Sequence, residues 1–312
     1  MTPRNSEKIL LTGAGGYIGR NMVKIIRAEW PNSRLIGVTR RPIEELGCEQ
    51  LAGDLTNREW VQQLVREVKP TLVFHFAAHI FGGEWNDYFL GNIQTAANLF
   101  DAVINEGVNC RIFVPGSAAE YGDAPPEQLP ITENCPFNPI SPYGVSKAWQ
   151  YELAAFYAKG RGADIVMGRI FNLIGQNMHE NLSVGYFERQ LRAIRRGEQP
   201  AEVKIWNPTS RRDFVDVDDA CRAVLSIAAN GVAGEAYNIC SGQSASTGTL
   251  LAMMAERVGV NVSLVDDPRH SGRIGIPDSY GSYGKLLTLC GWRPTISLDE
   301  SVNRIFSDIP MK

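Results

Sequence analysis

Residues 9–19 read ILLTGAGGYIG, a short apolar run followed by glycines at positions 13, 16 and 19. The run Lys8–Thr12 predicts a strand, and the amphipathic segment Tyr17–Ala28 predicts a helix. Glycines between a strand and a helix permit a tight turn, a close approach of backbone to a pyrophosphate, and packing of the helix on a sheet. The amino end of the helix offers free N–H groups to phosphates. A plain tight turn is the alternative, but this placement favours a dinucleotide-binding loop formed by Gly13, Gly16, Tyr17, Ile18 and Gly19.

Strand-like and helix-like segments alternate through the first half of the chain. Further strands are expected at Arg34–Val38, Thr71–Phe76, Arg111–Pro115 and Asp164–Arg169, and helices at Asn57–Val68, Asn92–Asn105 and Ser146–Lys159. Such alternation predicts an α/β fold with a Rossmann-type doubly wound parallel sheet. Beyond residue 170 the regularity breaks, which indicates a smaller C-terminal α/β lobe for substrate. We expect 1–170 to form the dinucleotide-binding domain, with 214–238 returning to it, and 171–213 with 239–312 to form the second lobe.

Composition excludes several classes of function. The 312 residues carry a net charge of −3, whereas a nucleic-acid binder is usually basic. The six cysteines are scattered without metal-ligand spacing, so neither a disulfide framework nor a metal site is expected. No apolar stretch approaches the ~18 residues of a membrane span, and no signal-peptide core is present. We therefore expect a cytoplasmic protein without membrane or nucleic-acid partners.

A second pattern carries catalytic chemistry. Residues 142–147 read PYGVSK, which places Tyr143 and Lys147 one turn apart on the same face of a helix. The ammonium of Lys147 should lower the pKa of the Tyr143 phenol from its usual ~10. The phenol could then exchange a proton with a substrate oxygen while a hydride moves at the attached carbon. An exposed Tyr–Lys pair without a role is the alternative.

These two patterns together resemble the extended short-chain dehydrogenase/reductase family. Similar segments cover most of the chain: Phe113–Gly122 with Ser/Thr-x-x-x-Tyr-Gly, Arg169–Gly175 with Arg-x-Phe-Asn-x-x-Gly, Arg211–Asp219 with Arg-Asp-Phe/Tyr-x-x-Val-x-Asp, and Leu289–Pro294 with Leu-Gly-Trp-x-Pro. The resemblance implies an oxidoreductase that acts on a nucleotide-linked sugar. The best subfamily match is to the reductases of GDP-4-keto-6-deoxy-mannose.

The resemblance also assigns residues to roles. The catalytic set is Ser117, Tyr143 and Lys147. Cofactor-binding residues beyond the glycine loop are Thr39, Arg40, Arg41, Asp54, Leu55, Ala77, Ala78 and Asn92, together with Tyr143 and Lys147; Asn92 matches the family's structural asparagine. Substrate-binding residues are His79, Ser117, Ala118, Asn172, Arg212 and Arg273, of which Arg212 corresponds to a diphosphate ligand. His79 matches no family pattern; it either tunes selectivity or is a loop residue with a satisfied hydrogen bond.

The end of the second strand indicates which dinucleotide binds. NAD-binding proteins place a carboxylate there for the ribose 2′-hydroxyl, but this chain has Thr39 followed by Arg40 and Arg41. Guanidinium groups bind a 2′-phosphate that a carboxylate would repel. Two ordinary surface arginines are the alternative. We expect NADP as the cofactor and regard NAD as less favoured.

Departures from the family pattern narrow the reaction. The family's 4,6-dehydratases carry acid and base groups directly after the catalytic hydroxyl, where this chain has Ala118 and Ala119; Glu120 comes one residue later and should point away. The favoured reading is an NADPH-dependent reductase of nucleotide-linked 4-keto-6-deoxy-hexoses. An NAD-dependent 4-epimerase needs the same three catalytic residues, and a non-catalytic NADP-binding sensor on this fold is a further alternative.

Two of the expected helices suggest assembly. They carry apolar residues beyond what one sheet face would cover, namely Leu99, Phe100, Val103, Trp149, Leu153 and Phe156. In the family the corresponding helices pair with their symmetry mates, an isologous contact. The resemblance therefore implies a homodimer.

Overall fold

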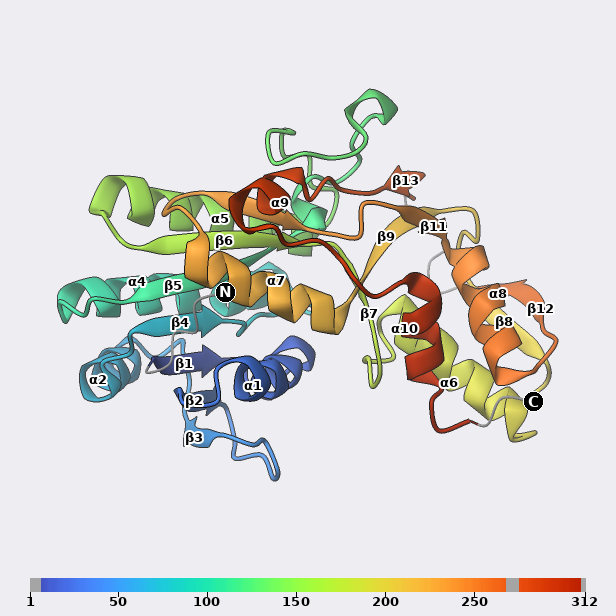
Figure 1. Ribbon diagram of the computed structural model, residues 1–312, viewed down its shortest axis with the longest axis horizontal. Helices are drawn as coiled ribbons and strands as arrows, with labels where there is room; N and C mark the ends of the chain where they lie inside the picture. The colour runs from blue at the N-terminus through green and yellow to red at the C-terminus, as the bar shows by residue number, and fades with distance from the viewer. Residues whose placement is uncertain (1–6, 268–274, 310–312) are drawn as a thin grey trace.

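A seven-stranded sheet organises the computed structural model, which describes residues 7–267 and 275–309 (Figure 1). The strand order is β10-β6-β5-β4-β1-β2-β3, and every neighbouring pair is parallel. The bounds are β1 Lys8–Thr12, β2 Arg34–Thr39, β3 Glu49–Ala52, β4 Leu72–His75, β5 Arg111–Ser117, β6 Ile165–Ile170 and β10 Ala236–Ile239. This architecture confirms the Rossmann-type fold class.

Helices cover both faces of the sheet. One face carries α1 (Tyr17–Glu29) and α7 (Val217–Asn230), and the other carries α2 (Arg58–Val68), α4 (Thr95–Asn105) and α5 (Pro142–Arg161). Side chains of β1 alternate between the two faces: Ile9 and Leu11 belong to the core under α1 and α7, whereas Leu10 belongs to the core under α2 and α4. All three are fully buried, and each such burial stabilises the fold by about 1.5–3 kcal/mol.

Shorter elements build the second part of the molecule beside the carboxyl ends of the strands (Figure 1). Helices α6, α8 and α10 enclose an apolar core of their own. A small sheet has the order β11-β9-β13, with β7 also paired to β9, and β8 pairs with β12. The bounds are β7 Asn172–Ile174, α6 Ser183–Arg195, β8 Glu202–Ile205, β9 Arg211–Asp216, β11 Ser244–Ser246, α8 Thr247–Val258, β12 Ser263–Asp266, β13 Asp278–Ser279, α9 Gly284–Cys290 and α10 Leu298–Ile305.

Two helices differ from their expected bounds in ways that affect the site. Helix α5 begins at Pro142 rather than at residue 146, because the Ser141 hydroxyl accepts a hydrogen bond from the Gly144 N–H at 3.1 Å and proline suits the first helical position. Tyr143 therefore lies in the first turn of α5. Helix α4 is preceded by α3 (Trp85–Tyr88) and by the π-helical segment η1 (Phe89–Gln94), which carries Asn92.

The apolar residues that suggested a dimer fall into two groups. Leu99, Phe100 and Val103 of α4 are at most 5% exposed and pack in the core with α2 and α5, so the expectation of an uncovered apolar face there is wrong. The sequence pattern counted one covering surface, but two neighbouring helices also pack against α4. On α5, Trp149 and Phe156 are more than half exposed, whereas Leu153 is partly buried against the core under α2 and α4.

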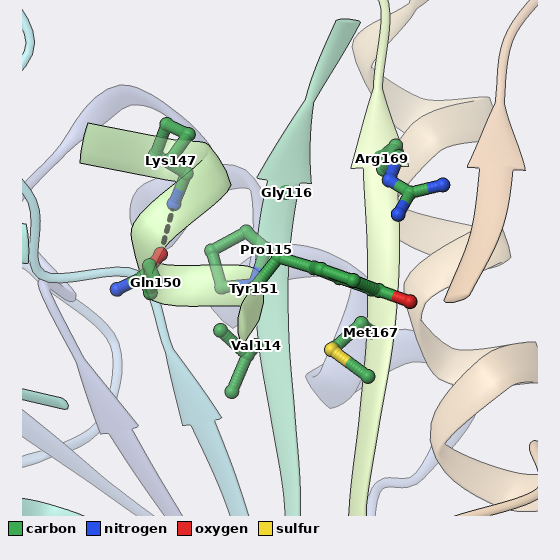
Figure 2. Close-up of a pocket in the computed structure, with 8 residues that line it drawn as sticks. All are labelled: Val114, Pro115, Gly116, Lys147, Gln150, Tyr151, Met167 and Arg169. Atoms are coloured by element: carbon green, nitrogen blue, oxygen red, sulfur yellow. Dashed lines mark hydrogen bonds between the residues drawn. The ribbon is translucent and has the colours of Figure 1, made fainter. Parts of the chain in front are cut away.

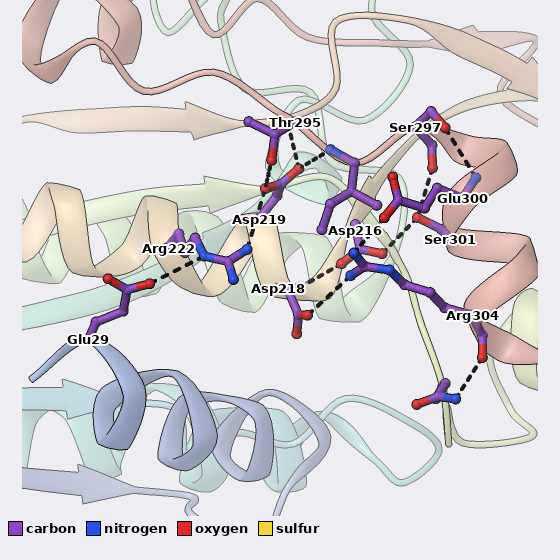
Figure 3. A network of polar contacts seen from close by, with 12 residues as sticks. Glu29, Asp216, Asp218, Asp219, Arg222, Thr295, Ser297, Glu300, Ser301 and Arg304 are labelled. Carbon is purple, nitrogen blue, oxygen red and sulfur yellow. Dashed lines mark hydrogen bonds and ion pairs between the residues drawn. The ribbon is translucent and has the colours of Figure 1, made fainter. Parts of the chain in front are cut away.

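A cluster of polar side chains, which we call the α7 cluster, joins residues 295–304 to α7 (Figure 3). Asp216 caps α7 by accepting the Asp218 N–H at 2.9 Å, and its other oxygen accepts the Ser301 hydroxyl at 2.7 Å. Asp219 accepts hydrogen bonds from Thr295 and Ile296, and Arg304 pairs with Asp218 at 3.3 Å. The cluster consists of Asp216, Asp218, Asp219, Thr295, Ser301 and Arg304.

Within residues 7–267 and 275–309, each helix is too short or too polar to cross a lipid bilayer.

Candidate active site

The glycine loop after β1 has the geometry of a cradle. Gly13 has a φ of +67°, and a Cβ there would lie 2.5 Å from the carbonyl carbon of Phe76. A Cβ on Gly19 would lie 2.2 Å from the Gly13 carbonyl oxygen, so only glycine lets α1 approach the loop. Gly16 forms the N-cap of α1 without a side-chain cap, which leaves the first helical N–H groups available to a phosphate.

The end of β2 adds a second indication of a ligand. The Thr39 hydroxyl is buried and has no hydrogen-bond partner in the part of the chain that the structure describes. Buried polar groups are normally paired. The glycine cradle and this hydroxyl therefore fit a dinucleotide, with Arg40 and Arg41 exposed on the same rim.

A groove with a volume of about 1620 Å³ runs along the carboxyl ends of the strands, where ligands bind in open α/β sheets. It brings together most of the predicted residues: Gly13, Gly16, Tyr17, Ile18, Gly19, Thr39, Arg40, Arg41, Asp54, Leu55, Ala77, Ala78, His79, Ser117, Ala118, Tyr143, Lys147, Asn172 and Arg212. Asn92 does not line the groove; it is fully buried behind it. Arg273 lies outside the described residues.

Ser117 and Tyr143 meet at the centre of this groove. Ser117 ends β5 and opens the 3-10 turn η2 (Ala118–Glu120), and its hydroxyl accepts the Ala119 N–H at 3.2 Å. Burial raises the pKa of Tyr143 to about 12, while a hydrogen bond with Ser117 opposes this rise. The expected lowering of the phenol pKa is therefore wrong for this structure. The reason is that the cost of desolvating the phenolate outweighs its hydrogen bond with Ser117.

Lys147 lies beside these groups in a desolvated position. Its exposure is 2%, and burial lowers its pKa to about 8, against the opposing effect of the Glu120 charge. Its Nζ donates a hydrogen bond to the side-chain oxygen of Gln150. Among the described residues it has no carboxylate at ion-pair distance, so its charge is held by a neutral amide.

Glu120 points into the core, away from the groove. One of its oxygens accepts the Ser117 N–H at 2.7 Å, and the other accepts Nε of Arg169 at 2.8 Å. The exposures of the two side chains are 0% and 2%. The guanidinium carbon of Arg169 lies 4.4 Å from the ring centre of Tyr151 and 4.7 Å from that of Phe137. Glu120 therefore holds the backbone of Ser117 in place and offers no acid or base to a ligand in the groove.

The second lobe contributes a cation to the groove. Nη1 of Arg212 donates to the Ile276 carbonyl at 2.8 Å and to the Arg211 carbonyl at 2.6 Å, and Arg212 forms no ion pair in the described part of the chain. Burial lowers the pKa of Arg212, although Asp278 and Asp123 oppose the shift. A half-buried cation bound only by carbonyl groups is suited to an anionic ligand.

His79 is held by its own loop. The backbone N–H of His79 donates to the Asn92 side-chain oxygen at 2.7 Å, and the backbone carbonyl of His79 accepts from the Asn92 side-chain amide at 3.0 Å. The ring Nε2 lies 2.7 Å from the Gly82 carbonyl oxygen. This favours the reading of His79 as a loop residue with a satisfied hydrogen bond.

Sequence reasoning missed Gln150 and His75. Gln150 lies three residues after Lys147, a helical spacing that would have signalled contact. His75 ends β4; its Nδ1 lies 2.9 Å from the Thr12 hydroxyl, and burial lowers its pKa to about 3 with help from the Lys147 charge. His75 is therefore neutral beneath the site.

Comparisons with known proteins agree with this geometry. A model of the NAD dependent epimerase/dehydratase family matches residues 9–240. The chain is similar to the GDP-6-deoxy-D-mannose reductase of Pseudomonas aeruginosa, at 27% identity over 307 residues that cover 97% of both proteins. It is also similar to a putative UDP-glucose 4-epimerase of Methanocaldococcus jannaschii, at 26% identity over 95% of this chain and 96% of that protein. The solved structure of RMD from Pseudomonas aeruginosa complexed with NADPH matches with a TM-score of 0.86 at 25% identity, over 98% of each chain.

Proposed function

Because the chain belongs to the NAD dependent epimerase/dehydratase family, we propose that it reduces the 4-keto group of a nucleotide-linked 4-keto-6-deoxy-hexose with NADPH. Its relatives are nucleotide-sugar reductases and epimerases, which supports an oxidoreductase of sugar nucleotides. The observation that carries the choice of NADPH is the rim beside the glycine cradle. There the Thr39 hydroxyl, which has no partner among the described residues, adjoins Arg40 and Arg41 at the position where NAD-binding proteins carry a carboxylate.

The catalytic groups have forms that suit reduction. The glycine loop, Thr39, Arg40 and Arg41 would hold NADPH, which would supply the hydride for the keto carbon. A phenol with a pKa of about 12 is protonated at neutral pH, so Tyr143 is ready to give a proton to the oxygen that gains negative charge. Ser117 donates a hydrogen bond to that oxygen, and the ammonium of Lys147 stabilises the phenolate that Tyr143 becomes.

The neighbouring residues support reduction over elimination. Ala118 and Ala119 line the groove next to Ser117 and carry no titratable group. Glu120 is occupied by Ser117 and Arg169 behind them. With no second acid or base at this place, proton and hydride transfer at one carbon is the chemistry that these residues support.

The second lobe is proposed to hold the sugar nucleotide. In this division, 1–170 with 214–238 binds the cofactor, and 171–213 with 239–312 binds the substrate. Arg212 would contact the diphosphate, and Asn172, exposed in the groove, would contact the sugar. The exposed Trp149 and Phe156 on α5 support a homodimer, which sedimentation at micromolar concentration tests; a monomer would contradict it.

Cofactor preference provides the decisive experiment. Each charge-assisted hydrogen bond to a 2′-phosphate should contribute ~1.5–3 kcal/mol, so one bond gives roughly ten- to a hundredfold preference for NADPH over NADH. The double variant Arg40→Ala/Arg41→Ala should lose most of that preference while its NADH affinity changes little. Dissociation constants from fluorescence titration measure both.

A matched control removes the same charge elsewhere. Arg58 and Arg189 are exposed and do not line the groove, so Arg58→Ala/Arg189→Ala should keep the cofactor preference. Turnover is then measured as NADPH oxidation over a panel of nucleotide-linked 4-keto-6-deoxy-sugars. Stoichiometric NAD retained through purification, with interconversion of sugar nucleotides in the absence of NADPH, would overturn the reductase and establish the 4-epimerase. Tight NADPH binding without turnover of any sugar nucleotide would favour the sensor.

A further inference from the structure

We propose that Gln150 is a positioning residue that fixes the place and the proton affinity of the Lys147 ammonium. The proposal rests on the proposed function only in taking Lys147 to act in the reaction. Gln150 lies almost one turn beyond Lys147 on α5 and is 1% exposed. Figure 2 shows the two side chains joined on the same part of the helix, above the strands that carry Pro115 and Met167.

The orientation of the Gln150 amide is set from outside α5. Its Nε2 donates to the backbone carbonyl of Asn92 at 2.7 Å, across 58 residues of sequence. A carbonyl accepts only from the NH₂ end of an amide, so the oxygen end must face Lys147. Lys147 has donors and no acceptor, which makes this the matching orientation.

Asn92 is itself held in place by hydrogen bonds of its side chain. Asn92 belongs to the π-helical segment η1, and its side-chain amide donates to the Ser146 hydroxyl at 2.8 Å. The Ser146 hydroxyl in turn donates to the backbone carbonyl of Tyr143 at 2.8 Å. The path Tyr143–Ser146–Asn92–Gln150–Lys147 therefore joins the phenol-bearing turn of α5 to the ammonium through buried groups. Isolated π-helical turns are frequent at functional sites, and here the turn supplies the anchor.

No water fits behind Lys147 while the Gln150 amide is in place. The crevice behind Lys147 is bounded by Val114, Pro115, Gly116 and Met167, and it has no room for a water molecule (Figure 2). Arg169, on the neighbouring strand, is engaged with Glu120 and the surrounding aromatic rings. On this side, Gln150 is the acceptor that the packing allows.

The other titratable groups around Lys147 affect its pKa separately from the Gln150 amide. Glu120 of η2 raises the pKa of Lys147, and Arg169 of β6 offsets that carboxylate by pairing with it. His75 of β4 is neutral, and Tyr143 of α5 is protonated at neutral pH. Burial lowers the pKa of Lys147 to about 8, and a neutral acceptor opposes that lowering less than a carboxylate would.

Two substitutions at position 150 should move that pKa in opposite directions. Gln150→Glu places a carboxylate at the same reach and should raise the pKa of Lys147 by about one to three units. Gln150→Leu removes the acceptor at similar volume and should lower it by about one unit. The matched control Gln190→Leu alters another buried, hydrogen-bonded glutamine, on α6, and should leave the pKa of Lys147 unchanged.

The pKa of Lys147 is measured as the midpoint of two independent pH profiles. The first is the alkaline limb of kcat/KM for reduction, and the second is the alkaline limb of NADPH affinity, followed by fluorescence without any sugar substrate. Lys147→Met should abolish the inflection in NADPH affinity and so assign it. Opposite shifts in the two Gln150 variants, with none in Gln190→Leu, are the expected result.

Shifts in the same direction, an unmoved midpoint, or an inflection that persists in Lys147→Met would overturn the proposal. A merely structural role would lower the rate or the stability of both variants without moving their midpoints apart. If no sugar nucleotide is reduced, the proposed function fails, but the midpoint in NADPH affinity still decides the role of Gln150.

Discussion

Two clusters of charged groups in this protein differ in how their buried carboxylates are stabilised. Behind the groove, next to Ser117, Glu120 and Arg169 are 0% and 2% exposed and pair directly with each other. In the α7 cluster, the ion pair of Asp218 with Arg304 is more than a third exposed on both sides. The buried carboxylate Asp219 of that cluster receives hydrogen bonds from neutral donors on Thr295 and Ile296, and its ion pair with the partly exposed Arg222 is longer, at 3.8 Å.

The two clusters therefore differ in the free-energy cost of desolvating their charged groups. Desolvating an ion pair costs several kcal/mol per ion, and Coulomb attraction repays it only with good geometry. The buried Glu120–Arg169 pair carries this cost at a place where Glu120 also holds the backbone of Ser117. The α7 cluster joins the segment 295–304 to α7 mainly through neutral donors and exposed charges, which cost less.

The largest expected effect is on chemistry and not on folding. Tyr143→Phe removes the proposed proton donor from the groove, so turnover should fall by ~10²–10⁴. The free energy of unfolding should change by no more than about 1 kcal/mol, because only the hydrogen bond with Ser117 is lost. Steady-state kinetics and urea unfolding measure both quantities. Turnover within about threefold of the wild type would show that Tyr143 is not the acid.

Removing one partner of the buried pair should have the largest effect on stability. Arg169→Leu leaves Glu120 as an uncompensated buried charge and should lower the free energy of unfolding by about 3–5 kcal/mol. The double variant Glu120→Gln/Arg169→Leu keeps an acceptor for the Ser117 N–H without the charge, and should regain part of this loss. If the double variant is as unstable as Arg169→Leu, packing around the guanidinium, and not charge, accounts for the cost.

The α7 cluster should respond more weakly to loss of its cap. Asp216→Ala removes the acceptors of the Asp218 N–H and of the buried Ser301 hydroxyl, which together should cost about 2 kcal/mol. Asp216→Asn serves as its control, because asparagine caps helices about as well as aspartate. A cost equal to that of Arg169→Leu would remove the distinction between the two clusters.

The smallest effect is expected for the exposed ion pair. Arg304→Ala breaks the contacts with Asp218 and Glu300, both partly exposed, and should change the free energy of unfolding by less than about 1 kcal/mol. The difference from the wild type should shrink further as salt is added. Thermal unfolding at two ionic strengths measures it; a large effect that does not depend on salt would contradict the comparison.

The sequence predicted those parts of the site that depend on local spacing. The alternation of strands and helices, the Gly13–Gly19 loop and the four-residue step from Tyr143 to Lys147 each follow from neighbours along the chain. The groove accordingly brings the glycine loop, Ser117, Tyr143 and Lys147 together. The prediction for the α4 side chains was wrong, because their cover comes from helices distant in sequence.

Residues far apart in sequence set the properties that local spacing left undetermined. Glu120 meets Arg169 across 49 residues, and Gln150 meets Asn92 across 58. The phenol pKa shows the consequence: the Tyr-x-x-x-Lys spacing indicated a lowered value, whereas burial raises the pKa of Tyr143 to about 12. Thus the sequence by itself determined the fold class, the glycine loop and which candidate side chains meet in the groove. Only the tertiary structure decided their protonation and their supports, because desolvation depends on what covers a group and not on what precedes it in the chain.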